Sequence, residues 1–346
     1  MILFRKIKIF TYCVIYLFIA LLIGELALRC QAKIIKQKKH IEWLRSIMTY
    51  DELLGWKHVP NAQVWSESKE YKVLYKINSK GLRDVERSYA KAKDKFRILC
   101  LGDSITFGWG VNAEERFTNI LEKNFANVEI INMGVQGYGI DQELLFLSEE
   151  GIKYQPNLIL IYIIHDDFIR ACYSKMWDRP KPQFLLNDTN ELILTNVPVP
   201  KVDVFCFHNP SLDQVRYYLA KKSYLFWFFQ NQIYFWREKN IKSINHERLK
   251  IEISRAILED MQRIARTCNA QLVLVGDIPE DIKVFLRANN IYFCSDPLSA
   301  YNGSESDVRY IELDHPNSFG HQLIAKGICS FLTNNKLIPK EYIVEK

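Results

Sequence analysis

One serine in this chain directly follows a stretch that is typical of a buried strand. Residues 96–101 read Phe-Arg-Ile-Leu-Cys-Leu, and Gly102-Asp103-Ser104 comes immediately behind them. A strand that ends in such a turn presents the serine hydroxyl at the carboxyl edge of a sheet, where open α/β folds bind their ligands. The sequence therefore predicts an α/β fold with Ser104 at the functional edge of its sheet.

A histidine and two carboxylates lie together near the other end of the chain. Residues 312–317 read Glu-Leu-Asp-His-Pro-Asn. A serine, a histidine and a carboxylate are the ingredients of a nucleophilic triad, which is recognised by the role of each side chain and not by chain order. Ser104 and His315 are therefore predicted to act as nucleophile and base.

Four short segments fall in the order of a known family. They are Gly102-Asp103-Ser104, Asn-Met-Gly-Val-Gln-Gly at residues 132–137, His165-Asp166-Asp167, and residues 312–315. This order resembles the four blocks of the SGNH (GDSL) hydrolases, over about residues 96–335. Residues 54–57, 60–61 and 78–84 resemble the leader of the membrane-tethered bacterial members. The resemblance implies an SGNH-type three-layer sandwich, with a parallel sheet flanked by helices.

The hydropathy pattern agrees with this fold class. Segments typical of strands alternate with segments typical of helices, which indicates a parallel sheet with helices on both faces. The predicted strands are 71–77, 96–101, 128–132, 157–164, 271–276 and 290–294, and the predicted helices are 114–125, 140–151, 246–267, 280–288 and 317–332.

The N-terminus carries a stretch long enough to cross a membrane. Residues 9–24 have no charge, and residues 25–28 extend the apolar span to about twenty residues, the length of a transmembrane helix. No small-x-small cleavage site follows cleanly, which favours an uncleaved anchor. Lysines and arginines flank both ends, so charge leaves the orientation open. The family resemblance implies a single-pass membrane protein with its catalytic domain on the extracytoplasmic (periplasmic) side.

The predicted organisation follows from these segments. It comprises a basic flank (1–8), a transmembrane anchor (9–28), a stalk (29–48), a leader packed on the hydrolase (49–95), and a hydrolase domain (96–346) with an aromatic-rich insertion (168–245).

The triad has one clear base and an open choice of acid. A serine hydroxyl needs an adjacent base, and His315 projects from the loop before the last predicted helix, whereas His321 falls inside that helix and fits a packing position. The resemblance places the acid three residues before the histidine, at Glu312, where the family has aspartate. Asp314 is the alternative, but consecutive side chains usually diverge.

The predicted oxyanion hole departs from the family pattern. The backbone N–H groups of Ser104 and Gly137 match two family donors, while Gly134 is interpreted as a turn glycine without a catalytic part. Asp166 stands where the family has a donor asparagine, and losing one such donor costs about a hundred- to a thousandfold in rate. Asp166 either is neutral through burial or points away and leaves a role to His165, or the chain is a catalytically weakened member.

The insertion divides into a loop-rich first part and a second part dense in aromatic side chains. The aromatic residues are Tyr217, Tyr218, Tyr224, Phe226, Trp227, Phe228, Phe229, Tyr234, Phe235 and Trp236. This part is interpreted as a lid or acyl-binding wall beside Ser104, as an element on the bilayer, or as a helix buried against the core. Trp109 is likewise a pocket wall or ordinary packing, and Trp56 and Arg83 are expected beside the active-site edge.

Composition excludes several other classes of function. The net charge is only +6, and much of it lies near the N-terminus without a basic motif of interleaved aromatics, so no nucleic-acid partner is expected. The seven histidines and eight cysteines are dispersed without metal-ligand spacing, and no phosphate-binding glycine loop is present. Neither a metal nor a cofactor is expected.

These observations together predict a membrane-anchored serine esterase of SGNH type. Its substrate would be an ester-bearing small molecule or an acylated glycan, and the resemblance points to small acyl groups such as O-acetyl. One alternative is an O-acyltransferase acting on an envelope glycan. The other is a catalytically weak SGNH-scaffold binding protein, which Asp166 favours.

Overall fold

The computed structural model describes residues 2–31, 46–176, 179–201, 246–311 and 314–344, with residues 219, 222–226, 228–229 and 232. The chain divides into two compact units. The first, called here the anchor unit, comprises Met1–Arg45 and Lys201–Ile244. The second, called the sheet unit, comprises Ser46–Pro200 and Asn245–Lys346.

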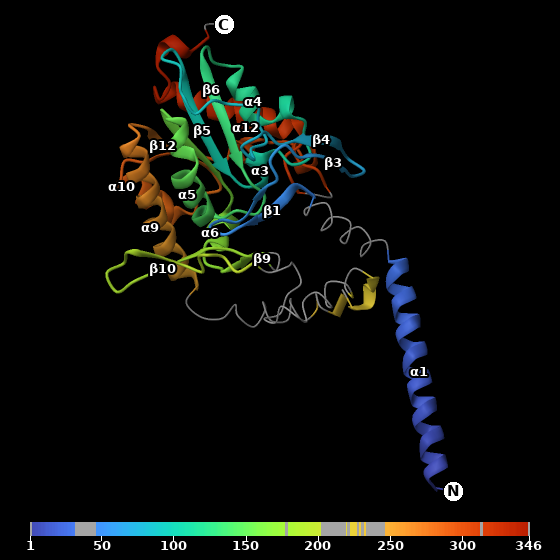
Figure 1. Cartoon of the computed structure of the whole chain (residues 1–346). Coiled ribbons are helices and arrows are strands. Elements are labelled where there is room, and N and C mark those ends of the chain that lie inside the picture. The colour runs from blue at the N-terminus through green and yellow to red at the C-terminus, as the bar shows by residue number, and fades with distance from the viewer. Residues whose placement is uncertain are drawn as a thin grey trace. The chain divides into compact units, whose positions relative to one another are not determined.

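Five parallel strands form the centre of the sheet unit (Figure 1). They are β5 (Phe96–Gly102), β6 (Val128–Gly134), β7 (Leu158–Ile163), β12 (Gln271–Gly276) and β13 (Tyr292–Ser295). Their spatial order is β6-β5-β7-β12-β13, so the chain reverses direction across the sheet between β5 and β7. Doubly wound sheets bind ligands beyond the carboxyl ends of the strands at such a switch point. The predicted α/β class with a parallel sheet is confirmed.

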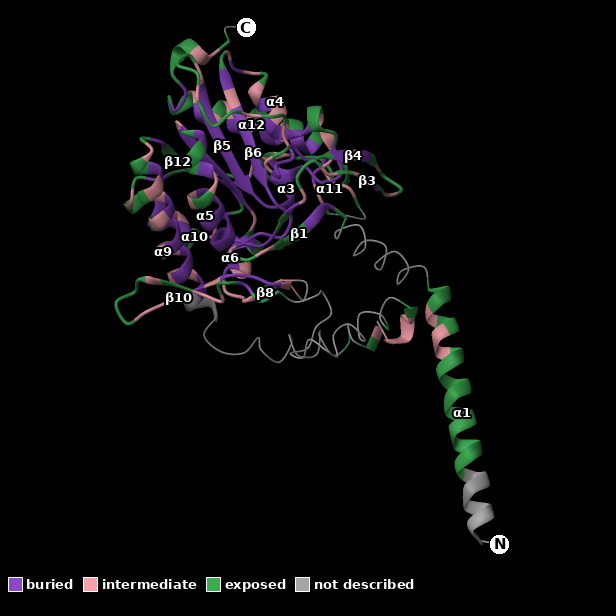
Figure 2. Cartoon of the chain, viewed as in Figure 1, coloured by how far each residue is buried: buried purple, intermediate pink, exposed green. Residues whose placement is uncertain are grey.

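Helices cover both faces of this sheet. On one face, α4 (Phe117–Glu122) and α12 (Ser318–Asn334) pack together over a core that includes Ile98, Leu160 and Val273. On the other face, α5 (Ile140–Glu149) packs against α9 (His246–Thr267), which also contacts α10 (Glu280–Ala288). The strands β5, β6, β7 and β12 are buried over nearly all of their length (Figure 2) because both of their faces are covered, whereas the edge strand β13 is only partly buried.

Short elements complete the unit. Its short helices are α3 (Ser104–Phe107), η1 (Ala113–Glu115), η2 (Gly151–Tyr154), α6 (His165–Arg170), η3 (Pro297–Ala300), α11 (Glu305–Val308) and η4 (Lys340–Tyr342). Its two-stranded ribbons are β1 (Met48–Asp51) with β2 (Gly55–His58), β3 (Gln63–Glu67) with β4 (Lys72–Lys76), β8 (Lys175–Met176) with β9 (Arg179–Pro180), and β10 (Gln183–Leu186) with β11 (Leu192–Thr195).

The helix predicted over 114–125 is the one clear departure from the expected elements. It is divided into η1 and α4 because Arg116 between them adopts an extended backbone, with φ −72° and ψ 140°. The guanidinium of Arg116 is buried, and it donates to the carbonyl oxygen of Arg83 and to Asn119 Oδ1. The helix is therefore divided at the residue whose side chain turns inward.

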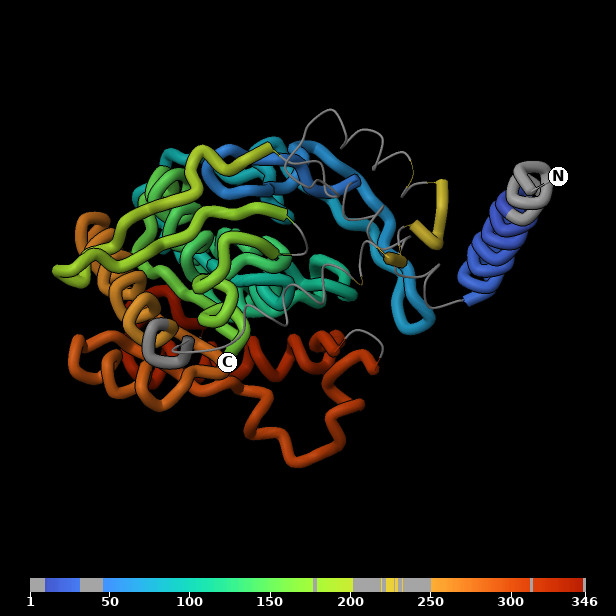
Figure 3. The backbone as a smooth tube through the Cα atoms, turned by 90° about the horizontal axis from the view of Figure 1, so that it is seen from below, coloured from blue at the N-terminus to red at the C-terminus, as the bar shows by residue number. Residues whose placement is uncertain are grey.

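The segment before β5 packs on the loops that follow β5 and β6. Trp56 Nε1 donates to the carbonyl of Gln136 at 3.1 Å, and Tyr138 Oη donates to the carbonyl of Trp56 at 2.5 Å. Further along, the Val199 N–H donates to Glu52 O at 2.6 Å, which places the blue leader beside the yellow-green ribbon in Figure 3. The expected position of Trp56 beside the active-site loops therefore agrees with these contacts.

The anchor unit contains the long helix α1 (Ile2–Cys30). Its segment Phe10–Cys30 has 21 residues with a mean hydropathy of 2.1, and none of its most apolar window is buried, so it has the length and composition of a membrane-crossing helix. Within this unit the Glu25 carboxylate accepts hydrogen bonds from Ser223 Oγ and from the N–H groups of Tyr224 and Leu225. Most of the predicted stalk and of the aromatic part of the insertion lies outside the described residues, so the lid hypothesis stays a prediction.

Candidate active site

The turn after β5 fixes the position of Ser104. Gly102 has φ 148°, and a side chain there would collide with Thr106 and with the carbonyl of Tyr162. Asp103 then caps α3, since its Oδ1 accepts the N–H of Ile105 at 2.9 Å. Ser104 is therefore the first residue of a short helix at the carboxyl edge of the sheet, with only 8% of its surface exposed.

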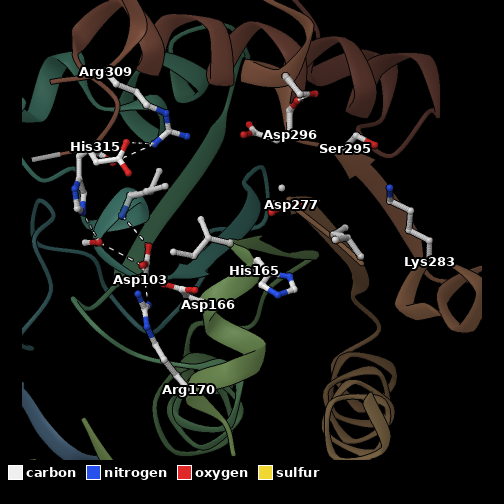
Figure 4. Close-up of a pocket in the computed structure, with 17 residues that line it drawn as sticks. Asp103, His165, Asp166, Arg170, Asp277, Lys283, Ser295, Asp296, Arg309 and His315 are labelled. Carbon is white, nitrogen blue, oxygen red and sulfur yellow. Dashed lines mark hydrogen bonds and ion pairs between the residues drawn. The ribbon is translucent and has the colours of Figure 1, made fainter. Parts of the chain in front are cut away.

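His315 meets Ser104 across the switch point of the sheet. The distance between His315 Nε2 and Ser104 Oγ is 2.7 Å, which is a hydrogen bond between the two side chains (Figure 4). His315 lies on the loop before α12, whose first turn is capped by Asn317 Oδ1 accepting the N–H of Gly320. The Trp109 ring lies 5.5 Å from the imidazole, so Trp109 is packed against the predicted base. The two predicted residues are thus brought together over 211 residues of sequence.

His321 lies away from this pair, inside α12. It is fully buried, its ring stacks on Phe117, and its Nδ1 accepts the Phe117 N–H at 3.3 Å. Burial lowers the pKa of His321 to about 3, and the positive charges of Arg116 and Arg83 act in the same direction. A neutral, packed imidazole agrees with the packing position expected for His321.

The structure describes only one of the two candidate acids, Asp314. Glu312 lies outside the described residues, so its role stays a prediction. Asp314 has a positive φ of 51°, its side chain is 83% exposed, and its carboxylate lies 3.7 Å from Arg309 Nη1. The adjacent position therefore directs this carboxylate towards Arg309, which agrees with the expectation that consecutive side chains diverge.

His165 and Asp166 are the first two residues of α6, and both line the pocket beside Ser104. Both side chains are exposed. The burial of Asp166 that one of the suggestions requires is therefore not observed. A carboxylate stands where an amide donor is expected.

The two glycines of the second block differ from each other. Gly137 has φ 76°, a conformation that favours glycine, and the described pocket lining does not include it, so its donor role stays a prediction. Gly134 was interpreted as a turn glycine, and this is wrong. It is the last residue of β6, and a side chain there would collide with the backbone of Thr106 and Phe107, so it permits β6 to lie against α3.

Arg170, the last residue of α6, lies beside the site although the sequence alone does not point to it. Its Nη1 donates to Asp103 Oδ2 at 2.9 Å and to Asp167 Oδ1 at 2.7 Å. Burial raises the pKa of Asp167 well above its ordinary value, the charge of Asp103 adds to this, and Arg170 acts against it. The Asp-Asp pair of the third block could have suggested a basic partner, but nothing near Arg170 in the sequence shows that it reaches Asp103.

A pocket of about 590 Å³ opens beside Ser104. It crosses the carboxyl ends of β5, β7, β12 and β13, and Figure 4 shows His315 at one end with Ser295 and Lys283 at the other. Its apolar side chains are Ile105, Ile164 and Ile278. The remainder of the lining is mainly polar or charged, including Asp166, Asp277, Asp296, Ser299 and Arg309. Such a lining suits a small, polar ligand better than a long alkyl chain.

No protein-family model and no curated protein matches the chain. Solved structures do resemble it, and several are hydrolases of the G-D-S-L type. The psychrotrophic esterase EstA from Pseudoalteromonas sp. is 15% identical with a TM-score of 0.41, over 69% of this chain and 98% of that one. A putative lipolytic protein of the G-D-S-L family from Desulfitobacterium hafniense is 14% identical with a TM-score of 0.40, over 69% and 100% of the two chains. Values this low say nothing about activity, so the chemistry of the site rests on its own residues.

Proposed function

We propose that this chain is a membrane-anchored serine esterase that removes a short acyl group from a polar carrier. The observation that carries the proposal is the 2.7 Å hydrogen bond between Ser104 Oγ and His315 Nε2, placed in a pocket at the switch point of the sheet. The apolar helix α1 would hold the protein in the membrane, with the sheet unit on the extracytoplasmic side. This side is the one implied by the family resemblance.

The reaction follows from the hydrogen bond. Nε2 of neutral His315 takes the proton of Ser104 Oγ as this oxygen attacks the ester carbonyl carbon. The imidazolium then gives its proton to the leaving alcohol oxygen, and the bond between this oxygen and the carbonyl carbon breaks to leave an acyl-enzyme. Water next loses a proton to His315 and attacks the acyl carbon, which releases the acid and restores Ser104. Glu312 is the proposed acid that orients His315, with Asp314 as the alternative.

The tetrahedral intermediate needs donors near Ser104. The N–H groups of Ser104 and Gly137 are proposed to stabilise its oxygen, as they would in the resembling family. The negative charge of Asp166 works against this stabilisation at short range. We therefore expect the wild-type protein to be slower than an otherwise identical protein with an amide at position 166.

The pocket lining defines the proposed substrate class. Three isoleucines give room for an acyl group of a few carbons, whereas the carboxylates and hydroxyls beyond them would hydrogen-bond a carrier rich in hydroxyl groups. An acetylated sugar has this combination of a small apolar group and many donors and acceptors. A sugar hydroxyl in place of water would turn the same chemistry into acyl transfer on a glycan.

A binding role is the second candidate, and the exposed carboxylate of Asp166 favours it. A protein that binds an acylated glycan without turning it over would keep the fold and the pocket. Such a protein would not need a donor at position 166.

The test is turnover of p-nitrophenyl acetate by the full chain in detergent, compared with its Ser104→Ala, His315→Ala and Asp166→Asn variants. We expect the first two to abolish turnover and Asp166→Asn to raise it by about tenfold or more, since even one donor is worth about a hundredfold. Acetate should be cleaved faster than the octanoate ester. Wild-type and Asp166→Asn proteins that are both inactive, on this ester and on acetylated xylan, would favour the binding role.

A further inference from the structure

Arg170 joins the three segments that carry Ser104, Gly137 and Asp166. One nitrogen, Nη1, contacts Asp103 at 2.9 Å, Asp167 at 2.7 Å and the carbonyl of Tyr138 at 3.1 Å. Each of these residues is the sequence neighbour of a proposed contributor to the site. Asp103 precedes Ser104, Tyr138 follows Gly137, and Asp167 follows Asp166.

The environment of Arg170 makes this contact strong. Asp103 and Asp167 are 1% and 0% exposed, and the Arg170 side chain is only 13% exposed. Charge-assisted hydrogen bonds are strengthened in such a water-poor setting. Gly139 allows the close approach, since a side chain there would press against Arg170 Cβ at 2.9 Å. The fold is therefore built to hold this guanidinium in place.

Arg170 also contacts an oxygen that competes for the nucleophile's proton. Ser104 Oγ lies 3.3 Å from Asp103 Oδ2, the same oxygen that accepts from Arg170, and 2.7 Å from His315 Nε2. The serine hydroxyl has one proton to donate. A cation on Oδ2 makes that oxygen a weaker acceptor, which leaves the proton directed to His315.

The negative charge beside the site needs a counter-charge. Burial raises the pKa of Glu143 well above its ordinary value, with further contributions from Asp167 and Asp103, while Arg170 lowers it. For Arg170 itself, burial lowers the pKa, but the carboxylates of Asp167, Asp103 and Asp166 outweigh burial and raise it above its ordinary value. The guanidinium therefore stays charged and offsets part of the charge of Asp166.

From these contacts we infer that Arg170 is a positioning residue for the proposed reaction. It connects the segments that carry Ser104, Gly137 and Asp166 through one guanidinium, and it keeps Asp103 from competing with His315 for the Ser104 proton. The inference rests on the proposed esterase function, and it also predicts a structural effect that does not depend on turnover.

The kinetic test compares Arg170→Gln, Arg170→Lys and Arg170→Ala with the wild-type full chain, using p-nitrophenyl acetate. We expect Arg170→Gln to lower kcat about 100-fold with little change in KM, because the reacting groups lose their alignment. Lysine should restore part of this loss, and added guanidinium chloride at millimolar concentrations should restore turnover in Arg170→Ala. Arg263→Gln is the matched control, since Arg263 also pairs with an aspartate three residues earlier on a helix but is 72% exposed.

A double-mutant cycle tests the counter-charge. The loss caused by Arg170→Gln should be at least threefold smaller in the Asp166→Asn background, where the charge at position 166 no longer needs to be offset. An equal loss in both backgrounds would overturn this part of the inference. An unchanged kcat in Arg170→Gln would overturn the positioning role, provided that wild-type turnover depends on Ser104.

Amide hydrogen exchange tests whether Arg170 stabilises the three segments, and it does not depend on catalysis. In Arg170→Gln we expect faster amide exchange in residues 102–108, 132–139 and 164–171 together, and no change in the Arg263→Gln control. Faster exchange in 164–171 alone would show that Arg170 stabilises only its own helix and would overturn the inference. A wild-type protein without Ser104-dependent turnover would instead count against the proposed function, and the exchange result would still decide the role of Arg170.

Discussion

Replacement of Arg83 by methionine tests whether the leader is an integral part of the sheet unit. The Arg83 side chain is 2% exposed, and its guanidinium donates to the carbonyls of Phe107 at 2.9 Å, Gly108 at 2.5 Å and Val111 at 2.6 Å. It also lies over the Tyr75 ring, 4.3 Å from the ring centroid. Burial lowers the pKa of Arg83 to about 9, so the side chain is still charged at pH 7.

The magnitude follows from the acceptors that the variant leaves behind. Three buried carbonyl groups would each lose a short hydrogen bond, at about 1–3 kcal/mol for each. The oxygens of Phe107 and Gly108 would keep only long contacts, to Arg116 Nη1 at 3.5 Å and to the Val111 N–H at 3.4 Å. Part of this loss is offset because the variant no longer desolvates a guanidinium. We therefore expect the free energy of unfolding to fall by about 3–5 kcal/mol. In a domain of this size each kcal/mol lowers Tm by about 2–4 °C, which gives a decrease of about 6–20 °C.

The assay is thermal and urea unfolding of the full chain in detergent, followed by tryptophan fluorescence. Arg287→Met on α10 is the control, because Arg287 is 56% exposed and its loss should change the free energy of unfolding by no more than about 0.5 kcal/mol. A decrease below about 1 kcal/mol for Arg83→Met would refute the reasoning. It would mean that the three carbonyls find other donors and that the leader contributes little to the stability of residues 107–111, which follow Ser104.

Two further predictions concern buried positions near the site. The pKa of His321 is about 3 in the folded protein and about 6.5 in the unfolded chain, so between these pH values only the unfolded chain gains a proton. The free energy of unfolding should therefore fall by up to about 1.4 kcal/mol per pH unit as the pH decreases from 6.5 towards 3. His321→Asn keeps an acceptor for the Phe117 N–H and should flatten this part of a urea-unfolding pH profile; an unchanged slope would assign it to other groups. Gly134→Ala should cost about 1–3 kcal/mol and most of the turnover, since the new methyl group forces β6 and α3 apart. Gly151→Ala is the comparison, because the nearest atoms to its new methyl group are the ends of the flexible Leu147 and Leu99 side chains, at 3.0 and 3.2 Å. Equal losses in both variants would contradict a special role for position 134.

The sequence predicts those parts of the site that depend on local pattern. An apolar run followed by Gly-Asp-Ser specifies a strand, a turn and a serine, and all three occur at residues 96–104. His315 was predictable for the same reason, because Pro316-Asn317 behind it begins a helix and leaves the histidine on a loop. Such local signals act over a few residues and need no knowledge of the partner.

What the sequence left unpredicted depends on contacts between distant segments. Arg170 looks like an ordinary basic residue at the end of a helix, and only the fold brings it to Asp103. Gly134 looks like a turn glycine until α3 is seen to lie against it. The exposure of Asp166 could not be read from the sequence either, because the strand before it is buried and so is Asp167, the next residue along the chain.

The hydrogen bond between Ser104 and His315 has a consequence for how the protein is made. The two residues are separated by 211 positions, so a ribosome has completed most of the sheet unit before the base exists. In the proposed reaction Ser104 needs His315 to take its proton, so during that interval the nascent chain could not cleave an ester. A shortened product that ends before His315 would be inactive for the same reason. Any ester cleavage by this protein in a cell would then come only from chains synthesised at least as far as His315.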